Sequence, residues 1–155
     1  MEQHERLLRD AINYFKTADH LTYVTYSLLK DQKLMLPIVN NLYSASVSAI
    51  AALLHHEKIY KRVDAFPLDI DSRIRLFEDV AKNKKINSNI VKAVKELRYI
   101  IKEQKDSPLE FARKEKLIIC NNDYSSINVI DINKIKGYTT NVRELLKIVS
   151  NIKDV

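Results

Sequence analysis

A stretch rich in small residues constrains the fold of this chain more than any other part of its sequence. Residues 38–58, IVNNLYSASVSAIAALLHHEK, carry serine or alanine at nearly every other position and contain neither glycine nor proline. Small side chains on several faces of a helix let neighbouring helices approach closely. We therefore expect one long helix that runs through the middle of a helical bundle.

A second amphipathic pattern precedes this segment. Over residues 4–30, apolar and small side chains recur with the helical period in two adjacent rows. The first row is Leu7, Tyr14, Leu21 and Leu28, and the second is Leu8, Ala11, Phe15, Ala18, Thr22, Thr25 and Leu29. A turn at Asp31-Gln32 leads to the central helix, expected over residues 34–61. Two helices of about 27 residues joined so closely must lie antiparallel, as a hairpin of roughly 40 Å.

Shorter elements follow this hairpin. Asp71 or Ser72 is expected to cap a third helix, and residues 88–105 have the apolar spacing of a fourth. The sequence Ser107-Pro108-Leu109-Glu110 has the form of a capping box with proline at the first helical position. It predicts that a short helix starts there.

The hydrophobic period changes in the last third of the chain. Residues 116–120 and 126–130 are rich in aliphatic and β-branched side chains, and the turn-forming Asn121-Asn122-Asp123 lies between them. This pattern predicts a β-hairpin. Asp131 then caps a final helix, expected over residues 132–152.

Together these patterns predict an all-α fold. We expect an antiparallel four- or five-helix up-and-down bundle, with two long N-terminal helices and a small β-hairpin appended near residues 116–130. No linker or repeat is visible, so residues 1–155 are interpreted as one domain, with the hairpin as an insertion and 132–152 as the C-terminal helix. Gly137 is expected to bend or break the start of that last helix.

Residue usage argues against several kinds of site. The chain has one glycine, whereas phosphate-cradling loops, dinucleotide-binding turns and nucleophile elbows need glycines at fixed positions. The single cysteine, Cys120, excludes an internal disulfide and a cysteine-based zinc site. His55 and His56 would point about 100° apart on a helix and could not share one ion. We therefore expect no cofactor, no metal site and no catalytic residues of a recognisable kind.

The sequence also carries signals for location. The first ten residues, MEQHERLLRD, are charged and lack the apolar stretch of a signal peptide. The longest apolar run, residues 47–54, is too short to span a bilayer. A cytoplasmic protein without a membrane partner is the expectation.

Basic residues are concentrated in one window. Residues 82–116 carry 11 Lys/Arg against 5 Asp/Glu, whereas residues 1–81 carry 10 against 11 and residues 117–155 carry 5 against 4. The whole net charge of +6 therefore resides in this window. A localised excess of this kind favours contact with an anionic partner such as nucleic acid.

One flank of the fourth predicted helix gathers these charges around a tyrosine. At 100° per residue, its members are Lys92, Lys95, Arg98, Tyr99, Lys102 and Lys105. Such cations could hold phosphates, and the tyrosine could stack on a base. The alternative interpretation is a solvated face whose lysine stems lie over the core.

The helical pattern resembles the HEPN domain, a family named for its occurrence in higher eukaryotes and prokaryotes and for nucleotide binding. The residues that carry the resemblance are Ala11, Tyr14, Phe15, Ala18 and Leu21 in the first helix and Leu42, Tyr43, Ala45, Val47, Ala49, Ala52 and Leu53 in the second. It covers about residues 5–105. The hairpin near 116–130 would be an addition to the common core.

The resemblance implies a homodimer. Many HEPN members are metal-independent ribonucleases or partners of small nucleotidyltransferases in toxin–antitoxin pairs, and the active ones carry an arginine followed, after four to six residues, by a histidine. No histidine of this chain follows an arginine at that distance; beyond Arg98 stand Gln104 and Lys105. Without an imidazole, no side chain with a near-neutral pKa is placed to exchange a proton with the ribose or leaving oxygen.

The sequence therefore favours a non-catalytic protein over an enzyme. It predicts a HEPN-like module that binds RNA, or a partner protein that handles nucleic acid, such as a nucleotidyltransferase. Two alternatives stay open. One is a metal-independent endoribonuclease with an atypical site around Arg98, and the other is a purely structural dimeric scaffold whose basic flank only keeps it soluble.

Overall fold

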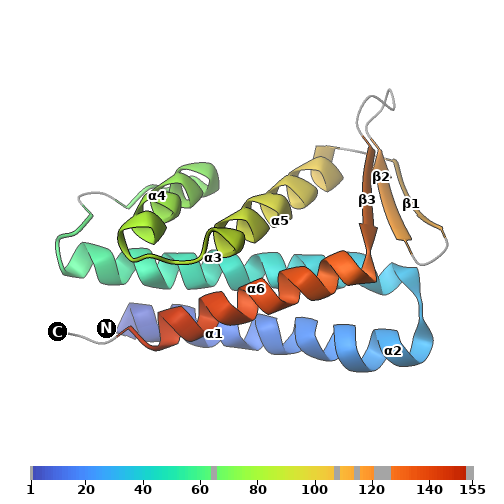
Figure 1. The fold of residues 1–155 in the computed structure, drawn as a ribbon, viewed down its shortest axis with the longest axis horizontal. Coiled ribbons are helices and arrows are strands. Elements are labelled where there is room, and N and C mark those ends of the chain that lie inside the picture. The colour runs from blue at the N-terminus through green and yellow to red at the C-terminus, as the bar shows by residue number, and fades with distance from the viewer. Residues whose placement is uncertain (1, 64–65, 107–108, 114–115, 121–126, 153–155) are drawn as a thin grey trace.

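The computed structural model describes residues 2–63, 66–106, 109–113, 116–120 and 127–152. In chain order the elements are α1 (Glu2–His20), a π-helical segment η1 (Leu21–Thr25), α2 (Tyr26–Leu29), a 3-10 turn η2 (Gln32–Leu34), α3 (Met35–Ile59), α4 (Ile70–Asn83), α5 (Ser88–Asp106), β1 (Leu109–Arg113), β2 (Lys116–Cys120), β3 (Ile127–Asp131) and α6 (Ile132–Ser150). Helices form the body of the molecule, and the small sheet lies at one end (Figure 1). The predicted all-α bundle is confirmed.

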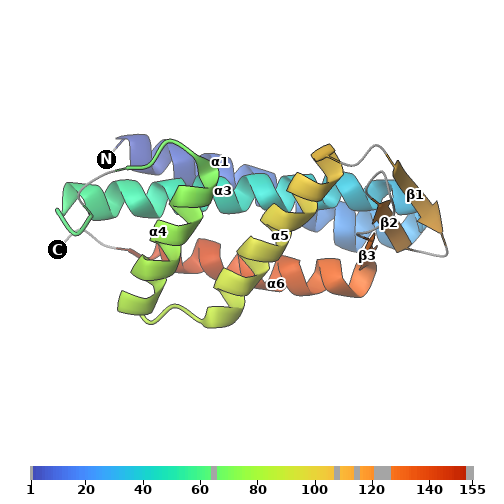
Figure 2. The same ribbon diagram turned by 90° about the horizontal axis from the view of Figure 1, so that it is seen from above.

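The central helix of the bundle is α3. It runs antiparallel to α1 and α2, α6 lies beside this pair, and α4 and α5 cross over the opposite side of α3 (Figures 1 and 2). Because α3 contacts α1, α4, α5 and α6, its small side chains are used inside the chain. Ala45, Ala49 and Ala52 are all fully buried. The small-residue faces are thus explained by packing within one protomer.

Central position also accounts for the apolar composition of this helix. Among the described residues, Gln32–Ile59 is the one helical stretch long and apolar enough to cross a membrane by length and composition, with a mean hydropathy of 1.3 in its most apolar window. Half of that window is buried inside the fold. A helix surrounded by four others needs such a composition to fill the core.

The first long helix contains one π-helical turn, which alters the predicted apolar rows. In η1, the buried hydroxyl of Thr22 donates a hydrogen bond to the Ala18 carbonyl oxygen at 2.7 Å. The wider turn adds a residue and rotates the helix beyond it, so Tyr26 is buried whereas Leu28 and Leu29 are 79% and 66% exposed. The prediction that Leu28 and Leu29 continue the apolar rows into the core was wrong for this reason.

The sheet has three antiparallel strands in the order β1-β2-β3. Phe111 pairs with Ile118, and Ile118 pairs in turn with Val129. The predicted short helix is wrong over Leu109–Arg113, because this segment forms strand β1 and pairs with β2. Its backbone N–H and C=O groups are thereby satisfied by sheet hydrogen bonds instead of helical ones. Ser107 and Pro108 of the proposed capping box and the proposed turn at 121–123 lie outside the described residues.

Two aspartates set the starts of α4 and α6. Asp69, two residues earlier than expected, caps α4: its Oδ2 accepts a hydrogen bond from the Ser72 backbone nitrogen at 2.9 Å. Asp71 lies inside the first turn of α4, and its side chain pairs with Arg98 of α5 instead. Asp131 caps α6 as predicted, accepting from the Lys134 backbone nitrogen at 2.8 Å.

Helix α6 continues through Gly137 without interruption. The expected break at Gly137 is therefore wrong. A methyl group at Gly137 would meet nothing within 4 Å, so no close approach of another element requires glycine here. A glycine inside a helix costs about 1 kcal/mol relative to alanine. Burial of the neighbouring side chains of Ile135, Tyr138 and Thr139 offsets this cost.

Candidate nucleic-acid interface

A groove lies between α5 and α6, next to β3. It holds a cavity of about 340 Å³, and an adjoining hollow continues it toward the start of α5. Together they are lined by Asn89, Lys92, Ala93, Lys95, Glu96, Tyr99 and Ile100 of α5, Val129 and Ile130 of β3, and Lys134, Gly137, Tyr138 and Asn141 of α6. We call this surface the α5–α6 groove.

Three lysines line the groove. Lys92 is exposed and has no ion-pair partner among the described residues. Lys134 donates from Nζ to the Val129 carbonyl oxygen at 3.2 Å, which holds its ammonium at the β3 side. Lys95 reaches Glu78 of α4, Nζ to Oε2 at 2.7 Å, and this hydrogen bond lowers the pKa of Glu78. Lys92 and Lys134 are therefore the two lysines whose charge no carboxylate of the described residues neutralises.

An aromatic ring and apolar side chains accompany these charges. Tyr99 is 50% exposed and Val129 is 39% exposed at the groove. Ile100 and Ile130 are buried behind them. A half-exposed ring next to ammonium groups is the combination that holds a base by stacking and its phosphate by charge.

The wall of the groove contains two polar side chains from opposite helices, Glu96 of α5 and Tyr138 of α6. Tyr138 is 7% exposed. Burial raises the pKa of Tyr138 far above its ordinary value, and the negative charge of Glu96 raises it further. The phenol therefore stays protonated, and Glu96 is the one acidic side chain among the described residues that line the groove.

Arg98, the centre of the predicted basic flank, faces α4 and α3 instead. Its Nε and Nη2 donate to the two carboxylate oxygens of Asp71 at 3.0 and 3.3 Å, and Nη1 lies 3.4 Å from the Tyr43 hydroxyl. The hydrogen bond from Arg98 lowers the pKa of Asp71. This guanidinium joins three helices, and it does not line the α5–α6 groove.

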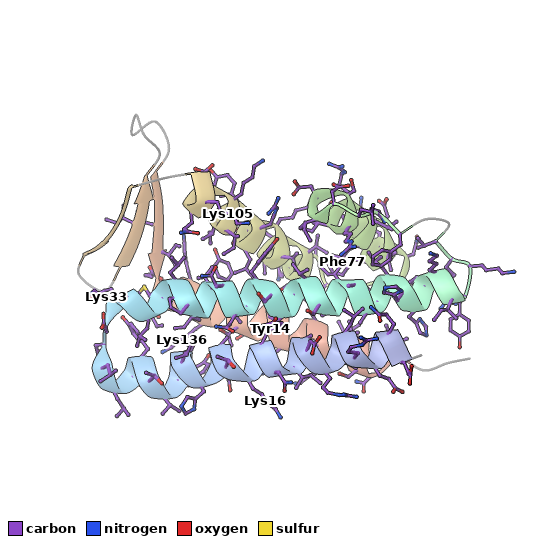
Figure 3. All side chains as sticks on the ribbon, turned by 180° about the vertical axis from the view of Figure 1, so that it is seen from behind. Tyr14, Lys16, Lys33, Phe77, Lys105 and Lys136 are labelled. Atoms are coloured by element: carbon purple, nitrogen blue, oxygen red, sulfur yellow. The ribbon has the colours of Figure 1, made fainter. Side chains whose placement is uncertain are left out.

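The structure thus divides the predicted flank. Lys92, Lys95 and Tyr99 lie together at the groove. Lys102 and Lys105 are exposed and are not among the residues that line the groove. Lys105 lies near the end of α5 (Figure 3).

Sequence reasoning missed the α6 side of the groove. Lys134, Tyr138 and Asn141 recur at the spacing of one helix face, as do Lys92, Glu96 and Tyr99 in α5. Either row could have been found from the sequence. Their juxtaposition could not, because α5 and α6 are separated along the chain by the whole sheet.

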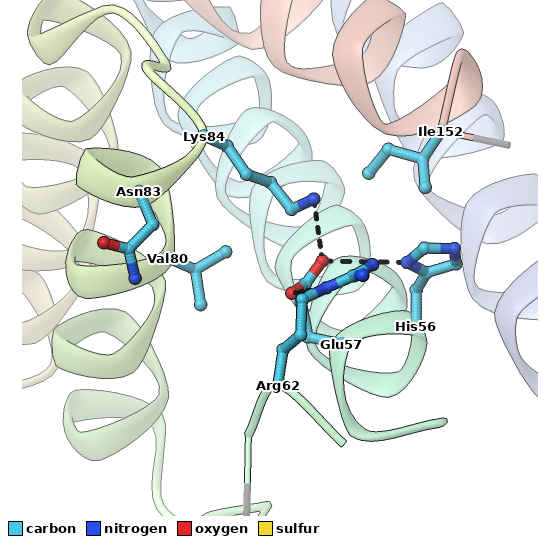
Figure 4. A pocket seen from close by; sticks show the side chains of 7 residues that line it. All are labelled: His56, Glu57, Arg62, Val80, Asn83, Lys84 and Ile152. Atoms are coloured by element: carbon cyan, nitrogen blue, oxygen red, sulfur yellow. Dashed lines mark hydrogen bonds and ion pairs between the residues drawn. The ribbon is translucent and has the colours of Figure 1, made fainter. Parts of the chain in front are cut away.

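A second cavity, of about 420 Å³, lies where the ends of α3 and α4 approach the end of α6 (Figure 4). Its central group is the carboxylate of Glu57, a residue that is 2% exposed. Arg62 Nε lies 2.7 Å from Glu57 Oε2, and Lys84 Nζ lies 2.9 Å from Oε1. We call this the Glu57 cavity.

Two helix ends bring these cations to Glu57. The Arg62 backbone nitrogen donates to the Glu57 carbonyl oxygen at 2.9 Å, an arrangement made possible by the left-handed conformation of Lys61 at φ 57°. Lys84 is the residue at which α4 ends. Burial acts to raise the pKa of Glu57, but the hydrogen bonds from Arg62 and Lys84 outweigh it and lower the pKa. The carboxylate is therefore ionised and engaged in joining α3 to α4.

The two adjacent histidines have separate surroundings. The His55 ring stacks on Phe66 with centroids 4.4 Å apart. The buried His56 ring lies 4.8 Å from Tyr60 and 5.7 Å from His4. Among the described residues, no group of three His, Cys, Asp or Glu side chains is arranged to hold a metal ion.

Comparison of this chain with protein-family models, with curated proteins and with solved structures finds no match. The fold and the two cavities therefore have to be interpreted from their own chemistry. Of the two, the α5–α6 groove offers cations that face solvent, whereas the cations of the Glu57 cavity already bind a buried carboxylate.

Proposed function

We propose that this protein is a HEPN-like, non-catalytic module that binds single-stranded RNA in the α5–α6 groove. The observation that carries the proposal is the convergence of Lys92, Lys134 and the half-exposed Tyr99 on one cavity. Ammonium groups that neutralise phosphates and a ring that stacks on a base are the two recurring parts of single-strand binding sites. The HEPN-like character rests on the long hairpin of α1 and α3 and on the alanine-rich central helix.

The contacts of Arg98 favour binding over catalysis. The alternative ribonuclease would need this guanidinium to face a phosphodiester. In the structure both of its donor edges are occupied by Asp71 and Tyr43, and those bonds connect α5 to α4 and α3. Withdrawing Arg98 toward a substrate would break them.

RNA affinity and its salt dependence test the proposal. Fluorescence anisotropy with a labelled single-stranded RNA should show binding that weakens as salt is raised, since each neutralised phosphate releases counterions. Contacts from Lys92 and Lys134 predict a slope of about −1.4 in log K against log salt, at about −0.7 per contact. Affinity weaker than millimolar at low salt would reject the proposal and leave the structural scaffold as the better interpretation.

We also propose that the protein forms a homodimer through the first long helix, which comprises α1, η1 and α2. The small residues of α3 pack against other helices of the same protomer, so they do not support a dimer. The support comes from exposed apolar side chains on the first long helix: Tyr14, Val24 and Leu28 are 42%, 45% and 79% exposed. Light scattering should give twice the 18.1 kDa mass of one chain. Leu28→Glu should give the monomer mass with an unchanged helical spectrum; a monomeric wild-type protein at micromolar concentration would reject the dimer.

A nucleotidyltransferase-type partner rests on the HEPN resemblance alone. Co-purification from the native host, with protein and RNA identified together, distinguishes it from direct RNA binding. An RNA that remains bound when the protein partner is removed supports the RNA-binding module. If RNA is recovered only together with a partner protein, the partner and not this protein binds the RNA.

A further inference from the structure

The α5–α6 groove contains a feature that phosphate binding does not use. Glu96 lines both the cavity and its adjoining hollow, among three lysines. A binding surface for a polyanion gains nothing from a carboxylate at its centre, because the negative charge repels phosphate. Glu96 therefore calls for a ligand group that donates hydrogen bonds.

Glu96 lies opposite Tyr138 in the groove. The nearly buried phenol stays protonated because burial raises its pKa, so it adds no negative charge beside the carboxylate. An ionised carboxylate has about four lone-pair sites and no proton to give. The carboxylate of Glu96 can therefore accept only from N–H or O–H donors of a ligand.

Among the four RNA bases, only guanine presents two adjacent N–H donors, N1–H and N2–H, to a single carboxylate. Adenine and cytosine each place one amino donor beside a ring nitrogen that is itself an acceptor, and the ring N–H of uracil lies between two carbonyl oxygens. Each of these acceptors would face the carboxylate and be repelled by it. Base edges of this kind become accessible only in unpaired strands.

The rest of the groove fits such a base. Its volume of about 340 Å³ lies within the range of small-molecule sites, roughly 300–1,000 Å³. Tyr99 and Val129 offer exposed apolar surface beside Glu96. Lys92 and Lys134 lie on opposite helices, one turn from Glu96 and Tyr138 respectively, where they can meet the phosphates of the same nucleotide and its neighbour.

We propose that the α5–α6 groove selects an unpaired guanine of single-stranded RNA through two hydrogen bonds to Glu96. The inference rests on the proposed RNA-binding function and adds to it a base preference. Glu96 is a specificity-determining residue, and the lysines supply affinity that is independent of the base.

The test is anisotropy competition with RNA hexamers of uridine that carry one central G, A, C or inosine, next to the all-uridine strand. The G hexamer should bind about tenfold more tightly than the others, the size expected for charge-assisted hydrogen bonds. Inosine keeps N1–H and lacks the N2 amino group, so its strand should lie between G and A. Equal affinity for all five strands, or a preference for A or C, would overturn the inference.

Glu96→Gln should abolish the preference for G, because an amide offers one acceptor and places a donor against the other N–H. Binding of the all-uridine strand should strengthen slightly, because a neutral amide replaces the carboxylate that repels its phosphates. Should this variant lose its helical spectrum, the comparison of G with inosine on the wild-type protein decides alone. A wild-type protein that binds all five strands equally through its lysines would reject the guanine site but keep the RNA-binding function. A wild-type protein that binds no strand would reject both.

GMP as a competitor separates two sources of guanine. A guanine held within a strand gains contacts from neighbouring phosphates, so GMP should compete at least tenfold more weakly than the G hexamer. GMP that competes as well as the hexamer would assign the site to a free guanine nucleotide and overturn the strand-bound form.

Discussion

The Glu57 cavity and the α5–α6 groove each contain one glutamate among basic side chains, yet the two glutamates have opposite surroundings. Glu57 is almost fully buried and bound by Arg62 and Lys84 at 2.7 and 2.9 Å. Glu96 is partly exposed and shares the groove wall with a neutral phenol, Tyr138. In the Glu57 cavity the charges of Arg62 and Lys84 are neutralised by the buried carboxylate. In the groove, Lys92 and Lys134 are exposed to solvent and have no carboxylate partner among the described residues.

This difference separates stability from binding. An ion pair around a buried carboxylate holds its cations in place, and removal of one partner costs far more than a surface pair does. Cations without carboxylate partners stabilise little but attract anions from solution. We therefore expect substitutions at the Glu57 cavity to change the free energy of unfolding and to leave RNA affinity nearly unchanged. Substitutions at the groove should change RNA affinity and leave the free energy of unfolding nearly unchanged.

The largest expected effect is on stability, at Glu57. Glu57→Gln removes the charge that receives two charge-assisted hydrogen bonds and should lower the free energy of unfolding by about 3 kcal/mol. Urea denaturation monitored by circular dichroism measures this. RNA affinity at a temperature where the variant is folded should be unchanged. A loss below about 0.5 kcal/mol would mean that the Glu57 ion pairs behave like exposed ones.

The next effect is on binding, at Tyr99. Tyr99→Ala should weaken RNA binding by about 2 kcal/mol, because a base loses its stacking partner. The salt slope should stay the same, since the number of phosphate contacts does not change. Tyr23, 42% exposed on the first long helix, provides the control, and Tyr23→Ala should leave affinity unaltered. A changed slope with unchanged affinity at low salt would place Tyr99 outside the base site.

A smaller effect is expected when the lysines are replaced. The double variant Lys92→Ala, Lys134→Ala should reduce the salt slope by about one to two units and leave stability nearly unchanged, because both side chains are exposed. Lys16 is a matched control, exposed on α1 on the far side of the molecule from α5 (Figure 3). Equal slopes for Lys16→Ala and for the groove variant would show that binding follows overall charge rather than this groove.

The smallest effect is the pH dependence of stability near neutrality. Burial lowers the pKa of His56 from 6.5, so the unfolded chain takes up this proton at a higher pH than the folded protein does. The free energy of unfolding should therefore fall as pH drops below about 6.5 and level off once the folded histidine is also protonated. Glu57, whose pKa is lowered from 4.5, adds a second loss that begins below that value.

Replacement of His56 tests the first of these losses. His56→Gln should flatten the change in unfolding free energy between pH 7.5 and about 5.5, measured by urea denaturation at each pH. His55→Gln should flatten it as well, because burial also lowers the pKa of His55. Identical pH profiles for the wild type and both variants would show that neither ring is held in its neutral form.

The contrast between the two sites also shows what the sequence could reveal. The bundle, its long hairpin and the start of α6 were predictable, because helical period and capping residues are local signals. The π-helical turn and the strand Leu109–Arg113 were not, since they depend on packing of Tyr26 and on pairing with β2. Local propensity yields to tertiary structure at such places.

The same limit applies to the site. The flank of α5 was visible in the sequence as a row of basic residues. The sequence could not show that Arg98 forms an ion pair with Asp71, or that Lys95 forms one with Glu78. Both acids lie on α4, which is a separate element. Which cations of a basic face remain available is decided by the carboxylates that the fold brings next to them.

The single glycine of the chain provides the most direct test of the central claim, that RNA binds between α5 and α6. Gly137 lines the groove next to Tyr138 and Asn141, so protein labelled with 15N-glycine gives one backbone amide signal from the site itself. Titration with a short single-stranded RNA should shift this signal in proportion to saturation, and the Lys92→Ala, Lys134→Ala variant should require more RNA for the same shift. A Gly137 signal that stays in place while anisotropy shows the RNA to be bound would contradict the account.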